Sequence, residues 1–145
     1  SHGGGRYFAG AAFHNRQFPI DEEGEMASAE DSRRHTTCAW WIYGEQTVWT
    51  AADRSIACMA QYSENTSHDN GCCRYAEVGC AYTDSSNECG LSAQYARFNQ
   101  GTERSVELTW RRQINKTIAL QPSFQYVNND NGDFAVLCAR MSVSF

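Results

Sequence analysis

Residues 105–114 read SVELTWRRQI, and hydrophobic and polar side chains alternate along them. Val106, Leu108 and Trp110 fall on one side of an extended chain, and the polar side chains between them fall on the other. A period of two is the pattern of a β-strand with one apolar and one polar face. The stretch therefore predicts an amphipathic strand.

The rest of the chain repeats this pattern. Residues 117–127 read TIALQPSFQYV, residues 128–133 are a polar turn, and residues 134–145 read FAVLCARMSVSF. Pro122 cannot donate a ladder hydrogen bond, which predicts a bulge or a locally unpaired position. The chain stops at Phe145, on the apolar face of the last segment.

Five upstream segments show the same alternation more weakly, at residues 6–13, 39–49, 55–63, 74–83 and 90–98. With the three C-terminal segments they predict eight antiparallel strands in one domain, residues 1–145. Long or intermediate polar connections alternate with shorter ones. The longer set is 17–37, 64–71, 99–104 and 128–133, and the shorter set is 51–54, 84–89 and 115–116. This alternation is typical of an up-and-down transmembrane β-barrel with short periplasmic turns and longer external loops.

The composition is compatible with such a barrel. Hydrophobic residues make up 41% of the 145 residues, charged residues 20%, and the mean hydropathy is -0.59. No stretch approaches the roughly 18 apolar residues of a transmembrane helix. Strands that expose only alternate residues to lipid keep a low mean hydropathy. The net charge of -5 without a basic patch excludes a nucleic-acid binder.

Three features favour lipid over a soluble protein core on the apolar side. The first is aromatic side chains near strand ends, at Trp40, Tyr62, Tyr82, Tyr95, Trp110, Tyr126 and Phe145. The second is the charge on the opposite faces, which suits a water-filled lumen better than a packed core. The third is the terminal Phe145 itself.

The seven cysteines do not suggest a metal centre. Cys72 and Cys73 are adjacent, which is poor geometry for one ion, while Cys58, Cys80 and Cys138 fall inside predicted strands. Packing as small apolar side chains is favoured, and disulfides stay open as the alternative. No HxxxH, HExxH or GxSxG spacing occurs. The sequence therefore predicts a protein that is not an enzyme and holds no cofactor or metal.

Two segments near the C-terminus resemble a known family. Residues 103–127, ERSVELTWRRQINKTIALQPSFQYV, and residues 135–145, AVLCARMSVSF, resemble the end of carbohydrate-selective outer-membrane porins of the OprB type. The most specific matches are Glu107-Leu108-Thr109, Leu120-Gln121-Pro122, Gln125-Tyr126 and Arg140 before Phe145. Residues 44–49, 75–79 and 93–98 are similar to the preceding strands of the family.

The resemblance implies passive sugar uptake across the bacterial outer membrane, with lipid and small sugars as partners. The family barrel has sixteen strands, of the size that leaves an aqueous channel, and the eight strands here correspond to its C-terminal half. The other half is then either missing N-terminal sequence or supplied by further copies in a homo-oligomer. Ser-His-Gly-Gly-Gly at residues 1–5 reads as an interior turn, which favours the first.

A sugar-selective lumen needs aromatic surfaces and planar hydrogen-bonding groups. The predicted lumen residues are Trp41, Tyr43, Glu45, Trp49, Glu77, Glu107, Arg111, Gln121, Gln125 and Arg140. The competing interpretation is that their charges pair between strands and stiffen the wall.

Two other functions remain open at the level of sequence. One is a self-contained eight-stranded barrel that acts as an anchor or binding protein, in which the first strand pairs with the last. The other is a secreted carbohydrate-binding β-sandwich.

Overall fold

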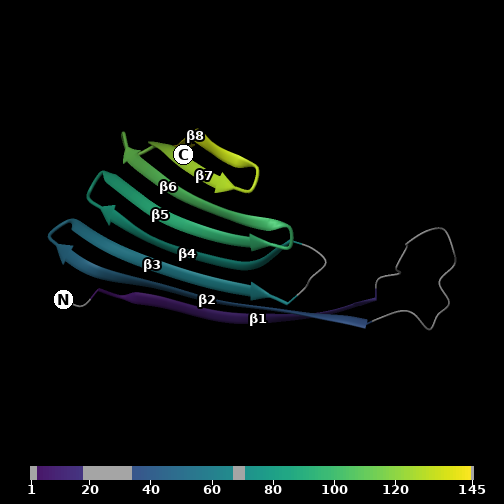
Figure 1. Cartoon of the computed structure of the whole chain (residues 1–145). Helices are drawn as coiled ribbons and strands as arrows, with labels where there is room; N and C mark the ends of the chain where they lie inside the picture. The colour runs from purple at the N-terminus through teal and green to yellow at the C-terminus, as the bar shows by residue number, and fades with distance from the viewer. Residues whose placement is uncertain (1–2, 18–33, 67–70, 145) are drawn as a thin grey trace.

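The chain forms one antiparallel sheet. The computed structural model describes residues 3–17, 34–66 and 71–144, and over these ranges it contains eight strands and no helix (Figure 1). The strands are β1 (Gly5–Gln17), β2 (Arg34–Ala51), β3 (Arg54–Asn65), β4 (Cys72–Thr83), β5 (Asn87–Phe98), β6 (Gly101–Gln113), β7 (Ile118–Asn129) and β8 (Gly132–Val143). They pair in sequence order, β1 to β8. The predicted all-β, up-and-down antiparallel architecture is confirmed.

No helix in the described part of the chain is long and apolar enough to cross a membrane. Phe145 and the charged segment 18–33 lie outside the described residues.

The strands extend further than the alternation predicts. Residues 99–104 were expected to form a loop, yet β6 begins at Gly101 and only Asn99 and Gln100 connect it to β5. Arg104 lies within the ladder, opposite Tyr95. That loop prediction is wrong because polar residues at the water-exposed ends of strands still make backbone ladder bonds. The predicted loop would leave the charged residue Arg104 outside the sheet, although it belongs to β6.

The two ends of the sheet are open. Every strand contacts its neighbours in sequence, and β1 makes no pairing with β8 among the described residues. The self-contained eight-stranded barrel predicted that pairing, so this alternative is wrong for the structure. Along β8 every residue from Gly132 to Val143 is exposed. The edges therefore present backbone donors and acceptors that lack a strand partner within the described chain.

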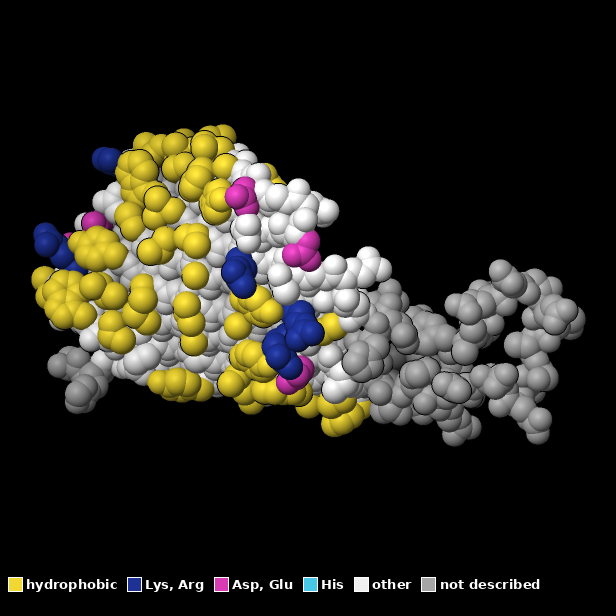
Figure 2. Space-filling model, in the orientation of Figure 1, with side chains coloured by type: hydrophobic (Ala, Val, Ile, Leu, Met, Phe, Trp, Pro, Cys, Tyr) yellow, Lys and Arg dark blue, Asp and Glu magenta, His cyan; other side chains and the backbone are white. Residues whose placement is uncertain are grey.

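One face of the sheet is apolar across all its central strands. The register places Cys58, Cys80, Leu91, Leu108, Phe124 and Leu137 in one row. Leu137 is 80% exposed and Leu108 is 53% exposed. Figure 2 shows hydrophobic side chains as a broad band on one surface of the sheet. We call this side the outer face, and the opposite, polar side the inner face.

Nothing in the described residues covers the outer face. The three buried residues of the described chain, Ala119, Val127 and Ser105, all lie on the opposite face by register. A β-sandwich requires a second sheet packed on the first, at a spacing of about 10 Å. The single layer of the described residues therefore does not support the secreted sandwich.

Aromatic side chains form two belts on the outer face. We call the sheet edge with the β1–β2 and β3–β4 connections the loop side, and the opposite edge the turn side. Trp40 and Tyr62 lie near the loop side with ring centroids 5.3 Å apart. Tyr82 and Trp110 each lie opposite Cys89 near the turn side. Two belts are the arrangement of barrel strands at the two membrane interfaces.

Trp49 belongs to the turn-side belt, which corrects its predicted place in the lumen. The β2–β3 register shifts between Thr47 and Trp49, so that Thr47 lies opposite Ala57 and Trp49 opposite Ile56. The bulge inserts Val48 and reverses the alternation beyond it. Ile56 itself lies opposite Tyr82 on the outer face.

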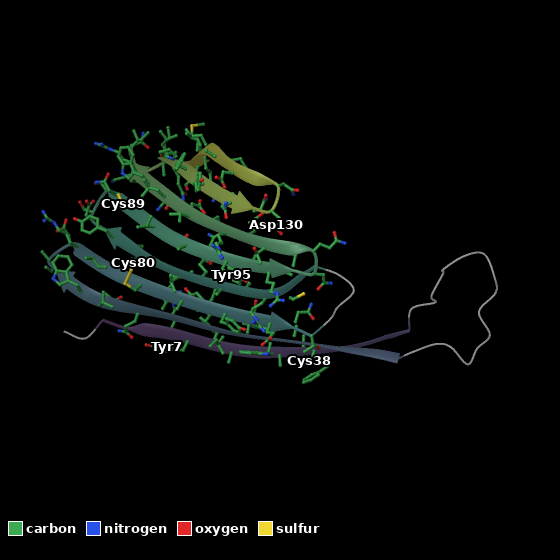
Figure 3. The ribbon with its side chains drawn as sticks, viewed as in Figure 1. Tyr7, Cys38, Cys80, Cys89, Tyr95 and Asp130 are labelled. Carbon is green, nitrogen blue, oxygen red and sulfur yellow. A yellow bond between two sulfur atoms is a disulfide. The ribbon has the colours of Figure 1, made fainter. Side chains whose placement is uncertain are left out.

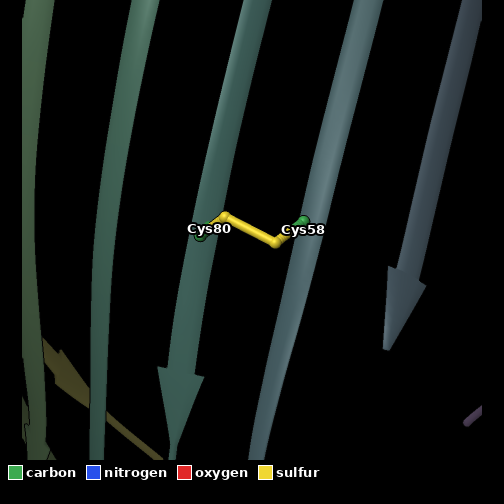
Figure 4. Close-up of a disulfide and its surroundings, with 2 residues drawn as sticks. All are labelled: Cys58 and Cys80. Atoms are coloured by element: carbon green, nitrogen blue, oxygen red, sulfur yellow. A yellow bond between two sulfur atoms is a disulfide. The ribbon is translucent and has the colours of Figure 1, made fainter. Parts of the chain in front are cut away.

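One pair of cysteines is joined. Cys58 on β3 and Cys80 on β4 face each other directly, 4.1 Å apart at Cα, and form a disulfide on the outer face (Figures 3 and 4). The other five cysteines, at positions 38, 72, 73, 89 and 138, are free. Packing as small side chains therefore fails for Cys58 and Cys80, because the ladder register brings their side chains together. For this pair, the disulfide alternative is correct.

We expect the denatured, unreduced protein to react with five equivalents of an alkylating reagent, and the reduced protein with seven. Mass spectrometry of the alkylated chain measures both numbers. Cys58→Ser should raise the unreduced value by releasing Cys80, whereas Cys138→Ser should lower it. Full labelling without reduction would contradict the assigned disulfide.

The β4–β5 turn depends on the carboxylate of Asp84. The backbone N–H groups of Ser86 and Asn87 each donate to Asp84 Oδ1 at 2.8 Å. These two hydrogen bonds lower the pKa of Asp84 below its ordinary value. In a turn of this type, a side-chain carboxylate accepts hydrogen bonds from backbone N–H groups two and three residues ahead and so stabilises the turn.

We expect Asp84→Asn to lower the denaturant midpoint at neutral pH, because the amide accepts more weakly than the carboxylate. A carboxyl group with a depressed folded pKa contributes stability above its ordinary pKa of about 3.9 and loses it as pH falls through the folded value. The difference between wild type and variant should therefore shrink below about pH 4. Unfolding curves at several pH values measure this difference; a constant difference down to pH 2 would contradict the role of the charge.

Candidate functional site

The inner face carries nearly all the predicted lumen residues. Every one of them except Trp49 lies there by register, on β2, β4, β6, β7 and β8. One row runs through Arg6, Glu45, Met59, Gly79, Ser92, Glu107, Gln125 and Val136. The alternation thus collects side chains from distant parts of the sequence on one polar surface.

Glu45 is held by two neighbours. Arg6 Nη2 lies 3.0 Å from both Glu45 carboxylate oxygens, and the Tyr43 hydroxyl donates to Glu45 Oε2 at 2.7 Å. The Tyr43 ring also lies 5.8 Å from Phe8, centroid to centroid. The polar groups of Tyr43 and Glu45 are therefore paired with each other and with Arg6 between β1 and β2.

Glu77 is the centre of a second polar cluster. Tyr75 donates to Glu77 Oε2 at 2.9 Å, and Gln61 donates to the same oxygen at 3.2 Å. Gln94 donates to Glu77 Oε1 at 3.3 Å and accepts from Ser105 at 2.9 Å. The cluster links β3, β4, β5 and β6 through side chains. Both oxygens of its carboxylate already accept hydrogen bonds.

Sequence reasoning missed the partners of these two carboxylates. Arg6, Gln61, Tyr75, Gln94 and Ser105 lie on predicted strands, but the pattern of one strand does not say which residue of the next strand faces it. The usable signal is the alternation itself, which puts all five on the polar side.

A second group of inner-face residues has no such partners. Glu107, Gln121, Gln125 and Arg140 make no side-chain hydrogen bond or ion pair within the described part of the chain. Glu107 lies opposite Gln125, and Arg140 lies opposite Gln121. The two pairs are four residues apart on β7, about 13 Å along the strand. Their hydrogen-bonding groups are available to a solute.

A hollow in the inner face joins three of these groups. Glu107, Gln121 and Arg140 line it with Thr109, Ser123, Cys138 and Ala139, and its volume is about 330 Å³. A neighbouring hollow of about 330 Å³ extends from Glu107 to Arg6 and Glu45. Volumes of this order fall at the lower end for sites that bind small molecules. A carboxylate, a guanidinium and an amide converge on the first hollow, a donor and acceptor set that suits sugar hydroxyls.

The remaining lumen candidates differ in their surroundings. Arg111 Nη1 lies 3.8 Å from Glu88 near the turn side, where both side chains are about half exposed. Trp41 is 44% exposed and covers Gly10 on β1, where a Cβ would clash with its ring. Glycine at this position allows the indole to lie flat on the neighbouring strand. Trp41 is thus an aromatic surface on the inner face.

No group of three or more His, Cys, Asp or Glu side chains with the spacing of metal ligands occurs among the described residues. The chemistry on this face is that of hydrogen bonding and charge.

The comparisons with known proteins agree with this arrangement. The family model described as carbohydrate-selective porin, OprB family, matches residues 4–145. No curated protein and no solved structure matches the chain. The match covers all eight strands and both faces of the sheet, and it belongs to a family of transport channels rather than enzymes. The chain is a member of the OprB family of carbohydrate-selective porins.

Proposed function

We propose that this chain forms part of the wall of an outer-membrane pore through which small sugars diffuse passively. The observation that carries the proposal is the contrast between the two faces. The outer face is apolar and uncovered, as contact with lipid requires, and the inner face is polar with Glu107 and Arg140 unpaired within the described residues. No energy source or covalent step is needed for such diffusion.

The open edges indicate how the pore is completed. Unpaired strand edges are untenable in lipid because each exposed backbone group loses its hydrogen bond to water. We propose that further strands close the sheet against β1 and β8, supplied by more of the same protein or by further copies. Eight more strands would give a barrel of about sixteen, a size with an aqueous channel.

The connections set the orientation. Residues 18–33, 66–71, 99–100 and 130–131 join strands on the loop side, while 52–53, 84–86 and 114–117 join strands on the turn side, so the two longest connections both lie on the loop side. Outer-membrane barrels place short turns in the periplasm and longer loops outside. We assign the loop side to the external surface and the turn side to the periplasm.

Within the pore, we assign solute contact to Glu107, Gln121, Gln125 and Arg140, with Trp41 on β2 as a further aromatic surface of the inner face. Tyr43, Glu45 and Glu77 are assigned to the wall, since their polar groups are already used. Arg111 belongs with the wall near the turn side through Glu88.

The test is conductance of the purified protein in a planar lipid bilayer. We expect stepwise ion conductance that decreases as a neutral sugar is added, because a bound sugar occupies the lumen. An amino acid of similar size is the control solute and should leave the conductance unchanged. Absence of conductance would contradict the pore, and conductance that no sugar reduces would contradict the selectivity.

A further inference from the structure

A cluster of arginines lies on the outer face, where lipid contact disfavours charge. Arg74 on β4 lies directly opposite Arg97 on β5, and Arg104 on β6 lies opposite Tyr95, two residues from Arg97. All three side chains are exposed. Figure 2 shows basic side chains at the border of the hydrophobic band, on the side of the long connection. We call Arg74, Arg97 and Arg104 the arginine cluster.

The protein neutralises only part of this charge. Glu64 Oε1 lies 2.9 Å from Arg74 Nη2. Arg97 and Arg104 form no ion pair with any described residue. Like charges directly opposite each other on neighbouring strands are destabilising. An anion bound between Arg74 and Arg97 would remove this repulsion.

The shape of the surface supports an anion of this kind. Arg74 and Arg97 line a hollow of about 460 Å³ together with Glu64, Thr66 and Phe98. Guanidinium groups bind phosphate through paired, charge-assisted hydrogen bonds, with a geometry that ammonium groups do not match. The hollow is large enough for a phosphate and the sugar or glycerol that bears it.

An apolar groove begins beside the cluster on the same face. Tyr62 and Ala76, which line the groove, are two residues along β3 and β4 from Glu64 and Arg74. The groove has a volume of about 580 Å³, and its floor consists of small residues, including Ala9, Gly44 and Ala60. Larger apolar side chains, Tyr7, Ile42 and Val78, line the groove beside these small residues. A charged hollow beside an apolar groove on the same face matches an amphiphile.

The geometry points to a binding site for a phosphate-bearing lipid of the outer leaflet, with phosphate on the arginine cluster and an acyl chain in the groove. The orientation rests on the proposed function, which puts the loop side outside the cell. In this orientation the arginine cluster lies at the level of the outer-leaflet headgroups, and the groove lies at the level of the acyl chains. The site lies on the face opposite the lumen, so it is separate from the sugar site.

The experiment measures lipid binding to the purified full-length protein in detergent by native mass spectrometry. The probes are lipid A, lipid A without its phosphates, and inorganic phosphate. We expect lipid A to bind and the dephosphorylated lipid to bind at least about fivefold more weakly, the weight of one charge near a membrane surface. Inorganic phosphate should compete only at much higher concentration, because it cannot occupy the groove. Equal binding of the two lipids, or equal potency of inorganic phosphate, would overturn the proposal.

Variants locate the site. Arg97→Gln with Arg104→Gln should weaken lipid A binding by about 30-fold, or about fivefold for each charge. Arg112→Gln is the matched control, since Arg112 lies on the same face of β6 near the turn side, opposite Leu120. It should leave binding unchanged. An equal loss in Arg112→Gln, or no loss in the double variant, would contradict the assigned site.

A variant that binds lipid A more tightly than the wild type cannot owe its altered binding to misfolding. Glu64→Gln removes the carboxylate that competes for Arg74, so lipid A should bind about fivefold more tightly. Unchanged or weaker binding would contradict the role of Arg74. Sugar block of conductance should persist in all these variants. If sugar does not block conductance in the wild type, the proposed function is contradicted. The lipid-binding measurement still tests the lipid site in that case.

Discussion

Leu108→Arg is expected to lower the free energy of unfolding of the membrane-inserted protein by about 2–4 kcal/mol, the cost of an arginine at the bilayer midplane on the lipid face of a barrel. Leu108 lies midway along β6 between Arg104 and Arg112, and its side chain is on the outer face in the row of Leu91 and Phe124. The stretch from Arg104 to Arg112 is about 27 Å long. This matches an apolar band about 25 Å tall. Equilibrium unfolding in guanidinium chloride, in lipid vesicles, measures the change.

Thr109→Arg is the matched control for this substitution. Thr109 is the next residue on β6, points to the inner face, and lines both hollows there. An arginine at this position reaches water in the lumen, so the free energy of unfolding should stay within about 0.5 kcal/mol of wild type. Equal destabilisation by the two variants would show that the outer face is not the one in contact with lipid.

Glu107→Gln and Arg140→Gln are each expected to weaken sugar block of conductance by about tenfold, while the pore continues to conduct ions. The loss of a charge-assisted hydrogen bond to a sugar hydroxyl costs about 1.5 kcal/mol, which corresponds to about tenfold in affinity. Both side chains line the same hollow and have no partner among the described residues, so neither substitution breaks a bond of the wall. Conductance against sugar concentration gives the affinity of each variant.

Glu77→Gln serves as the matched control for the lumen. It removes the same charge from the same face, but the oxygens of Glu77 already accept from Tyr75, Gln61 and Gln94. Sugar affinity should remain within about twofold of wild type, the range of a substitution away from the site. If Glu77→Gln weakens block as much as Glu107→Gln, the assignment of solute contact to the unpaired group is wrong.

The interruption at Pro122 shows what local sequence can predict about the sheet. The β6–β7 ladder runs to Thr109 opposite Ser123 and resumes at Arg112 opposite Leu120, with the same register on both sides. A proline lacks the N–H that the ladder needs, so a locally unpaired position follows from the residue alone. The β7–β8 ladder remains continuous and pairs Pro122 with Ala139.

Trp49 and Arg104 show where local sequence stops being sufficient. The alternation along β2 put Trp49 in the lumen, and the polar run before Ser105 put Arg104 in a loop. A bulge opposite Ile56 and a ladder pair with Tyr95 decide otherwise. Both depend on hydrogen bonds to a neighbouring strand, which one strand's pattern does not contain.

By itself, the sequence determined the eight strands and the two faces of the sheet, and its C-terminal segments resembled the porin family. The strands and faces follow from the period of two, because successive side chains of an extended chain point to opposite sides. Only the tertiary structure decided which inner-face carboxylates are paired, which cysteines are joined, where the outer arginines gather and that the edges of the described sheet stay open. Each of these depends on register between strands, and register is set by pairing across the sheet rather than by the pattern along one strand.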